Sequence, residues 1–292
     1  MTNRSYVSRW TGWALGTLAG LLVVAGAAIL PGQAWAIHVC ANPLPGVDSD
    51  GDGFTDAQEC AGITTVGTPT IPGTSITFPL CNGTLRRADC VDPDSKDVFA
   101  IYRPVATGSL LSGLPNPFGN NTFNGVVFTG LSALGLTVHQ LTSAQAASTR
   151  QVSSVSQQKA VRITESLSDG SLADPLGYCQ FGTPQGLDGC AVYTKRARAF
   201  IDSKCNGAAD TTTDRNQVFL AYATYIILHE TGHSLGGLAA RYDAAFGGYH
   251  YSPTASLVMS QAAQYSTQAN RCTWYIPSVW NPVLDPSAVI LK

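Results

Sequence analysis

The stretch DRNQVFLAYATYIILHETGHSLGG, residues 214–237, carries the clearest helix signal of the chain. Apolar residues fill it almost continuously from Val218 to Leu228, so a helix here is apolar on nearly all sides and has to be buried. Asp214 is a suitable N-cap, and the Gly-Gly pair that closes the stretch is typical of a helix end. The sequence therefore predicts a buried helix that begins after Asp214 and ends before the glycines.

The end of this helix carries residues suited to metal binding. His229 and His233 are four residues apart, so in a helix they lie one turn apart on the same face and can present two imidazole nitrogens to one ion. Glu230 lies beside them, where it can reach a water molecule without binding the metal itself. This H-E-x-x-H pattern predicts a zinc site, against the alternative of two core histidines and a surface glutamate.

The motif His229-Glu230-Thr231-Gly232-His233 resembles that of the zincin metallopeptidases. The third ligand separates their branches. In the gluzincins it is a later glutamate, but no glutamate follows Glu230 in this chain. In the metzincins the motif is H-E-x-x-H-x-x-G-x-x-H with a later methionine turn; Gly236 matches its glycine, but Ala239 stands where the third histidine should be.

A later residue must then complete the site. His250 is the only histidine after His233, and Met259 follows it in a stretch that resembles the methionine turn, whose thioether lies beneath the metal. A displaced histidine before such a turn is similar to the leishmanolysin-like metzincins, which implies His250 as the third zinc ligand. The alternative is Asp243, because residues 243–247 faintly resemble the aspzincin motif; Asp243 can also hold the second nitrogen of a histidine.

Three histidines and a water molecule make an open, catalytic type of zinc site, because structural zinc usually has four protein ligands. The resemblance implies a secreted zinc endopeptidase that acts on a protein or peptide substrate, with Glu230 as the catalytic base. The alternative is a calcium-dependent surface or adhesion module whose zinc site is not catalytic. The sequence does not indicate the oligomeric state.

A second motif, VDSDGDGFTDAQEC at residues 47–60, has the pattern of a twelve-residue calcium loop. Alternate carboxylates converge on the ion, a glycine allows the sharp turn, and a closing glutamate can bind with both oxygens. The positions 1, 3, 5, 6, 7, 9 and 12 are occupied by Asp48, Asp50, Asp52, Gly53, Phe54, Asp56 and Glu59. With cysteines on either side, the loop resembles the calcium repeats of thrombospondin type 3 and dockerin modules. The alternative is a solvated acidic loop.

A second acidic cluster follows in RADCVDPDSKDVF, residues 87–99. It has neither the loop glycine nor a closing glutamate, so a degenerate second calcium site and an acidic turn both remain open. Its acids are Asp89, Asp92, Asp94 and Asp97.

The N-terminus has the features of a secretory signal peptide, residues 1–36. Two arginines precede an apolar stretch from Trp13 to Leu30, and Ala34-Trp35-Ala36 fits the rule for cleavage before Ile37; a retained membrane anchor is the alternative. We expect a secreted protein, extracellular or periplasmic, with no membrane association after cleavage.

All 8 cysteines follow the predicted cleavage point, and an even number in an exported chain indicates disulfides. We expect two local pairs, Cys40 with Cys60 and Cys81 with Cys90. No nucleic-acid partner is expected, because the net charge is −2 and the mature chain has no basic run.

The remaining sequence predicts an α+β fold with a mixed twisted sheet. Residues 98–104, 136–141 and 190–201 are interpreted as strands, and the first part of residues 143–163 as a helix. The predicted organisation is a disulfide-stabilised, zincin-like catalytic domain at residues 98–292. Before it lies a small cysteine-rich calcium-binding segment at residues 37–97, called the acidic segment below.

Overall fold

The computed structural model describes residues 40–68, 71–114, 116–123, 126–128, 130–147, 150–156, 158–169, 176–180, 189–235, 242–243, 248–249, 264–268 and 271–275. The helices are α2 (Asp56–Ala61), α3 (Thr194–Lys204) and α4 (Thr212–Ser234), with short 3-10 turns η1 (Arg87–Asp89) and η2 (Leu131–Leu134). The central strands are β3 (Asp97–Arg103), β6 (Thr137–Leu141), β7 (Val161–Ser166), β8 (Gly177–Gln180) and β9 (Gly189–Tyr193). The short outer strands are β1 (Ile63–Thr64), β2 (Thr77–Phe78), β4 (Asn121–Phe123), β5 (Val126–Phe128), β10 (Tyr242–Asp243), β11 (Gly248–Tyr249), β12 (Gln264–Gln268) and β13 (Arg271–Tyr275).

Five strands form the central sheet in the order β6-β3-β7-β9-β8. Neighbouring strands from β6 to β9 are parallel, and β8 runs antiparallel to β9 at one end of the sheet. The predicted mixture of helices with a mixed sheet is therefore confirmed. Parallel strands of this kind are normally covered on both faces, and that is the case here.

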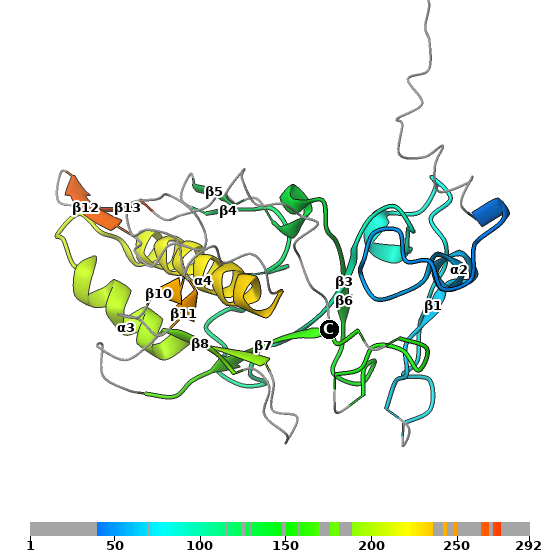
Figure 1. The fold of residues 1–292 in the computed structure, drawn as a ribbon. Helices are drawn as coiled ribbons and strands as arrows, with labels where there is room; N and C mark the ends of the chain where they lie inside the picture. Colours follow the sequence, from blue (N-terminus) through cyan, green and yellow to red (C-terminus); the bar gives the residue numbers. More distant parts are fainter. Residues whose placement is uncertain are drawn as a thin grey trace, which may run out of the picture.

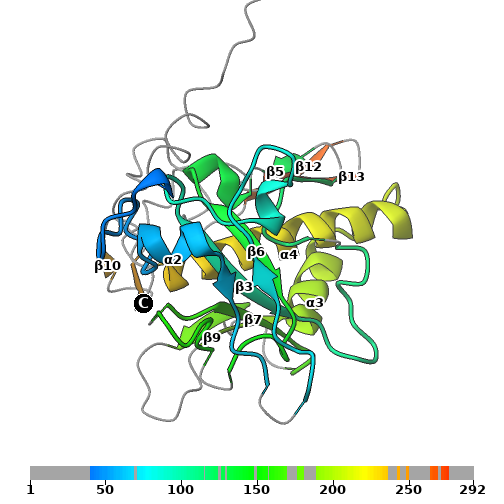
Figure 2. The same ribbon diagram turned by 90° about the vertical axis from the view of Figure 1, so that its right-hand side faces the viewer.

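Strand β3 supplies side chains to both faces of the sheet. Val98 and Ala100 belong to the core beneath the two long helices, whereas Phe99 and Ile101 belong to a second core shared with the acidic segment. This alternation follows from the two-residue period of a strand. Figure 1 shows α3 and α4 to the left of β3 and β6 and the acidic segment to their right, and Figure 2 views the sheet from the side that carries α2.

The predicted buried helix exists as α4, but its start was predicted three residues too late. The N-cap is Thr211, whose side chain accepts a hydrogen bond from the Asp214 backbone, while the Asp214 side chain accepts one from the Thr211 backbone. This reciprocal capping box explains why Asp214 has the signature of a cap although it lies inside the first turn.

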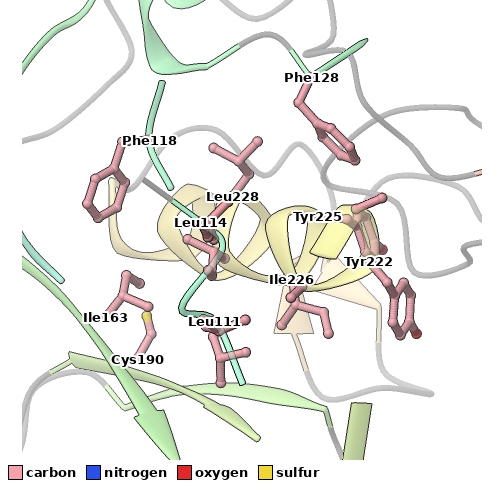
Figure 3. Packing of buried hydrophobic residues seen from close by; sticks show 14 of the residues in the cluster. Leu111, Leu114, Phe118, Phe128, Ile163, Cys190, Tyr222, Tyr225, Ile226 and Leu228 are labelled. Carbon is pink, nitrogen blue, oxygen red and sulfur yellow. The ribbon is translucent and has the colours of Figure 1, made fainter. Parts of the chain in front are cut away.

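Helix α4 packs on the sheet on one side and on β4 and β5 on the other. Figure 3 shows Ile163 and Cys190 of the sheet on one side of the helix and Phe118 and Phe128 on the opposite side. Burial on several sides accounts for the uninterrupted apolar sequence, because no face of the middle of the helix is left to water.

Two sequence-based assignments were wrong. Residues 190–201 are not one strand: β9 ends at Tyr193 and α3 follows, burying Ala197 and Ile201 at a helical spacing of four. The predicted helix in the first part of residues 143–163 is absent from the described residues, which form turns and a bridge between Gln151 and Lys159. Serines favour such turns because their hydroxyls bond to the local backbone.

The structure places Cys40 with Cys60 and Cys81 with Cys90 at disulfide-bonding distance, as predicted. Cys190 and Cys205 each take part in a disulfide bond as well. Among the residues that the structure describes, no helix is long and apolar enough to cross a membrane. The predicted signal peptide lies outside the described residues.

Candidate metal centres

The first candidate centre lies near the C-terminal end of α4. His229 and Glu230 are 8% and 6% exposed, so both side chains are buried. The Tyr225 ring lies one turn before His229, with the ring centroids 5.7 Å apart. His233 belongs to the last turn of α4, although its side chain is outside the described part. The backbone therefore places the two histidine positions on one helix face, as the sequence predicts.

A glycine on the sheet lies directly against the Glu230 carboxylate. A methyl group built on Gly177, the first residue of β8, would lie only 2.3 Å from Glu230 Oε1 and 2.8 Å from its carboxyl carbon. Such a close approach is possible only because glycine has no side chain. Strand β8 therefore approaches helix α4 closely at the Glu230 carboxylate.

Burial raises the pKa of Glu230 to about 8, because the charged form loses hydration. A nearby cation favours the charged form of such a carboxylate. Two histidine positions one helical turn apart provide nitrogen donors of the kind that zinc binds, and a buried carboxylate lies next to the first of them.

The other predicted members of this centre are not described in full. Gly236, His250 and Met259 lie outside the described residues, and Asp243 is described only as the backbone of β10, paired with Gly248. The third zinc ligand stays a prediction.

The second candidate centre is the acidic loop that precedes α2. Asp48 accepts hydrogen bonds from the backbone nitrogens of Gly51, Asp52 and Gly53 at 2.7, 3.2 and 3.0 Å. Gly51 and Gly53 have φ angles of 75° and 99°, which side-chain-bearing residues rarely adopt. The chain therefore turns tightly around the Asp48 carboxylate, as the loop pattern predicts.

Carboxylates of this loop converge with one from the central sheet. Oxygens of Asp48, Asp50 and Asp52 lie within 4.8 Å of one another, and so do oxygens of Asp52, Glu59 and Asp97. Asp97 is the first residue of β3, and the sequence placed it in the second acidic cluster instead. Nothing in the sequence marks this pairing, because 45 residues separate Asp97 from Asp52.

Several carboxylate oxygens in this centre are buried but have no hydrogen-bond partner. Glu59 is 0% exposed, and neither of its carboxylate oxygens has a hydrogen-bond partner; Asp50 Oδ2 has none either. Burial, reinforced by the neighbouring carboxylates, raises the pKa of Glu59 to about 11 and that of Asp50 to about 9. Burial, with a contribution from Asp97, also raises the pKa of Asp52 to about 7. Unpartnered carboxylates of this kind are rare in proteins and call for a positive partner.

Two further residues of the predicted loop have contacts outside the converging carboxylates. Asp56 belongs to neither group of converging carboxylates, and its two oxygens accept hydrogen bonds from the Ser49 nitrogen and hydroxyl, each at 2.8 Å. The Phe54 side chain is buried in the core between the acidic segment and the sheet, with its ring 5.7 Å from that of Phe99.

The second acidic cluster does not come together as one group in the described structure. Asp89 forms an exposed ion pair with Arg86, and Asp92 accepts a hydrogen bond from the Asp94 backbone. Asp97 instead bonds to His139 of β6, with Asp97 Oδ1 2.7 Å from His139 Nε2. His139 therefore orients a carboxylate that converges with those of the acidic loop.

Comparison of the chain with protein-family models, with curated proteins and with solved structures found no match.

Proposed function

We propose that this protein is a secreted zinc-dependent endopeptidase with its catalytic site on helix α4. The observation that carries the proposal is the buried Glu230 beside His229 on a helix that also contains position 233, with the absence of a side chain at Gly177 making room for the carboxylate itself.

In this proposal His229 and His233 hold the metal, and His250 completes the set. The α4 backbone fixes the spacing of the first two, and the packing of α4 between the sheet and strands β4 and β5 keeps that helix rigid. Zinc, when bound, supplies a Lewis acid that polarises a peptide carbonyl and acidifies water. Glu230 takes a proton from the attacking water and passes it to the departing amine.

Strand β8 offers a place for an extended peptide. It is the last strand of the central sheet, it packs against α4, and its first residue lies against Glu230. A peptide that adds to the open edge of a sheet is held by main-chain hydrogen bonds, which do not depend on its sequence. A substrate bound along β8 would therefore lie beside the general base.

The disulfides fit the proposed secretion, because such bonds persist in oxidising compartments outside the cytosol.

Casein digestion by the purified protein tests the function. We expect a zinc chelator to abolish hydrolysis and added zinc to restore it. Calcium is present in excess throughout and should not restore hydrolysis by itself, so the loss of activity reports the removal of zinc. Hydrolysis that continues at full rate in the zinc-free protein would contradict the proposal.

Gly177→Ala is expected to lower the rate of hydrolysis at least tenfold. The added methyl group would overlap the Glu230 carboxylate and displace it, and a displacement of about 1 Å in a catalytic group can cost on the order of 100-fold. The rate with casein is measured beside that of Gly113→Ala, where the added methyl meets only the flexible end of Leu220 at 3.2 Å. Equal rates for the two variants would refute the positioning of Glu230 by this glycine.

A further inference from the structure

We propose that Asp97 of strand β3 completes a buried calcium site with Asp48, Asp50, Asp52 and Glu59, and that the bound ion fastens the acidic segment to the central sheet. This site differs from the sequence-derived loop in gaining Asp97 and in leaving out Asp56. It does not rest on the zinc proposal, because it lies on the opposite face of the sheet from α4.

The spacing of the oxygens suits calcium. Calcium lies 2.3–2.6 Å from its ligand oxygens, so two oxygens on one ion are at most about 5 Å apart. Asp52 belongs to both groups of carboxylates, and within each group the ligand oxygens lie within 4.8 Å of one another. An all-oxygen set on a flexible loop selects a hard cation, and the number of carboxylates favours calcium over magnesium, which retains most of its water.

The buried acids at this place favour a cation. Asp52, Glu59 and Asp97 are all buried, and on the inner side the ring of His139 bonds to Asp97. On the exposed side Lys96 donates a hydrogen bond to the carbonyl of Gly51. Glu59 oxygens face the other carboxylates without any donor between them. A divalent ion at the centre would remove this repulsion and satisfy the unpartnered oxygens.

Hydrogen bonds already connect the loop with the sheet around this point. The Asp97 nitrogen donates to Asp52 Oδ2 at 2.8 Å. The Gln158 side-chain amide donates to the carbonyls of Asp52 and Asp97 at 2.9 and 2.7 Å. Ser156 Oγ donates to the Gly53 carbonyl at 2.7 Å. An ion held here is bound at once by the loop, by α2 through Glu59 and by β3 through Asp97.

The acidic segment is then a permanent part of the folded unit. Loss of calcium would leave several like charges buried together at the junction, and the acidic segment would separate from β3 first.

Thermal unfolding of the full chain after EDTA dialysis tests the site, with calcium chloride or magnesium chloride added back. We expect calcium to raise the Tm by about 5 °C or more and magnesium to raise it far less. Glu59→Gln should raise the Tm in EDTA, because without the ion a buried carboxyl group at this place is stable only if it takes up a proton, and should lose the calcium response. Asp97→Asn should also lose the response, whereas Asp89→Asn, an equal charge change at an exposed acid of the same segment, should keep it.

Trypsin digestion in calcium and in EDTA gives a second measurement that does not depend on the variants. Arg86, Arg87 and Lys96 lie in the acidic segment, and cleavage there should accelerate at least tenfold in EDTA. An unchanged Tm of the wild type on addition of calcium would overturn the proposal. So would a full calcium response in Asp97→Asn, because the ion would then not reach the sheet.

Discussion

Glu230→Gln is expected to lower the rate of peptide hydrolysis by about 100- to 10,000-fold without changing the zinc content. Glutamine has the size of glutamate but cannot accept the proton of the attacking water. Because Glu230 is not among the predicted zinc ligands, the metal should stay bound. The rate is measured with casein and the zinc content by atomic absorption, so that loss of catalysis is separated from loss of metal.

Asp202→Asn is the control for this variant. Asp202 is a carboxylate on α3 that pairs with Arg198, so the change has the same charge effect outside the proposed site. Its rate should equal that of the wild type. If Glu230→Gln digested casein as fast as this control, the peptidase proposal would fail. Zinc bound by a wild type that digests nothing would favour the alternative of a non-catalytic surface module.

Phe99→Ala is expected to reduce the free energy of unfolding by about 3–5 kcal/mol. Phe99 is 1% exposed on β3, and its ring makes edge contacts with Phe54 and Phe78 at centroid distances of 5.7 and 5.3 Å. Truncation leaves a cavity between the acidic segment and the sheet, and it removes two aromatic pairs in addition to buried area.

Urea unfolding with the disulfides intact measures this loss. Ile71→Ala is the control, because Ile71 is an exposed apolar residue of the same segment and its truncation should cost less than about 0.5 kcal/mol. A loss below about 1 kcal/mol in Phe99→Ala would contradict the packing of the acidic segment on β3.

The sequence predicted the elements whose signals are local. The apolar run before His229 predicted α4, and the spacing of Asp48, Asp50 and Asp52 predicted a loop that turns around a carboxylate. These elements could be predicted because burial pattern and turn geometry depend on residues that are close together in the sequence. Where a local pattern allowed two readings, as at residues 190–201, the interpretation failed in its second half.

The contacts that depend on the fold were not predictable. Asp97 joins the acidic loop because β3 begins beside it, and His139 reaches Asp97 because β6 lies next to β3 in register. Gly177 meets Glu230 only after β8 has paired with β9. The order of strands in a sheet has no local sequence pattern. None of these residue pairs could therefore be predicted from the residues around them.

The alternation of β3 side chains between the two cores also affects the cooperativity of unfolding. A slip of its pairing by a single residue would move Phe99 and Ile101 under the long helices and turn Val98 and Ala100 towards the acidic segment. That exchange would overpack one core and leave cavities in the other. Both cores are therefore well packed only with the same alignment of β3. With calcium bound, the two faces of the molecule are therefore expected to melt in a single transition, although the residues that build them are far apart in the chain.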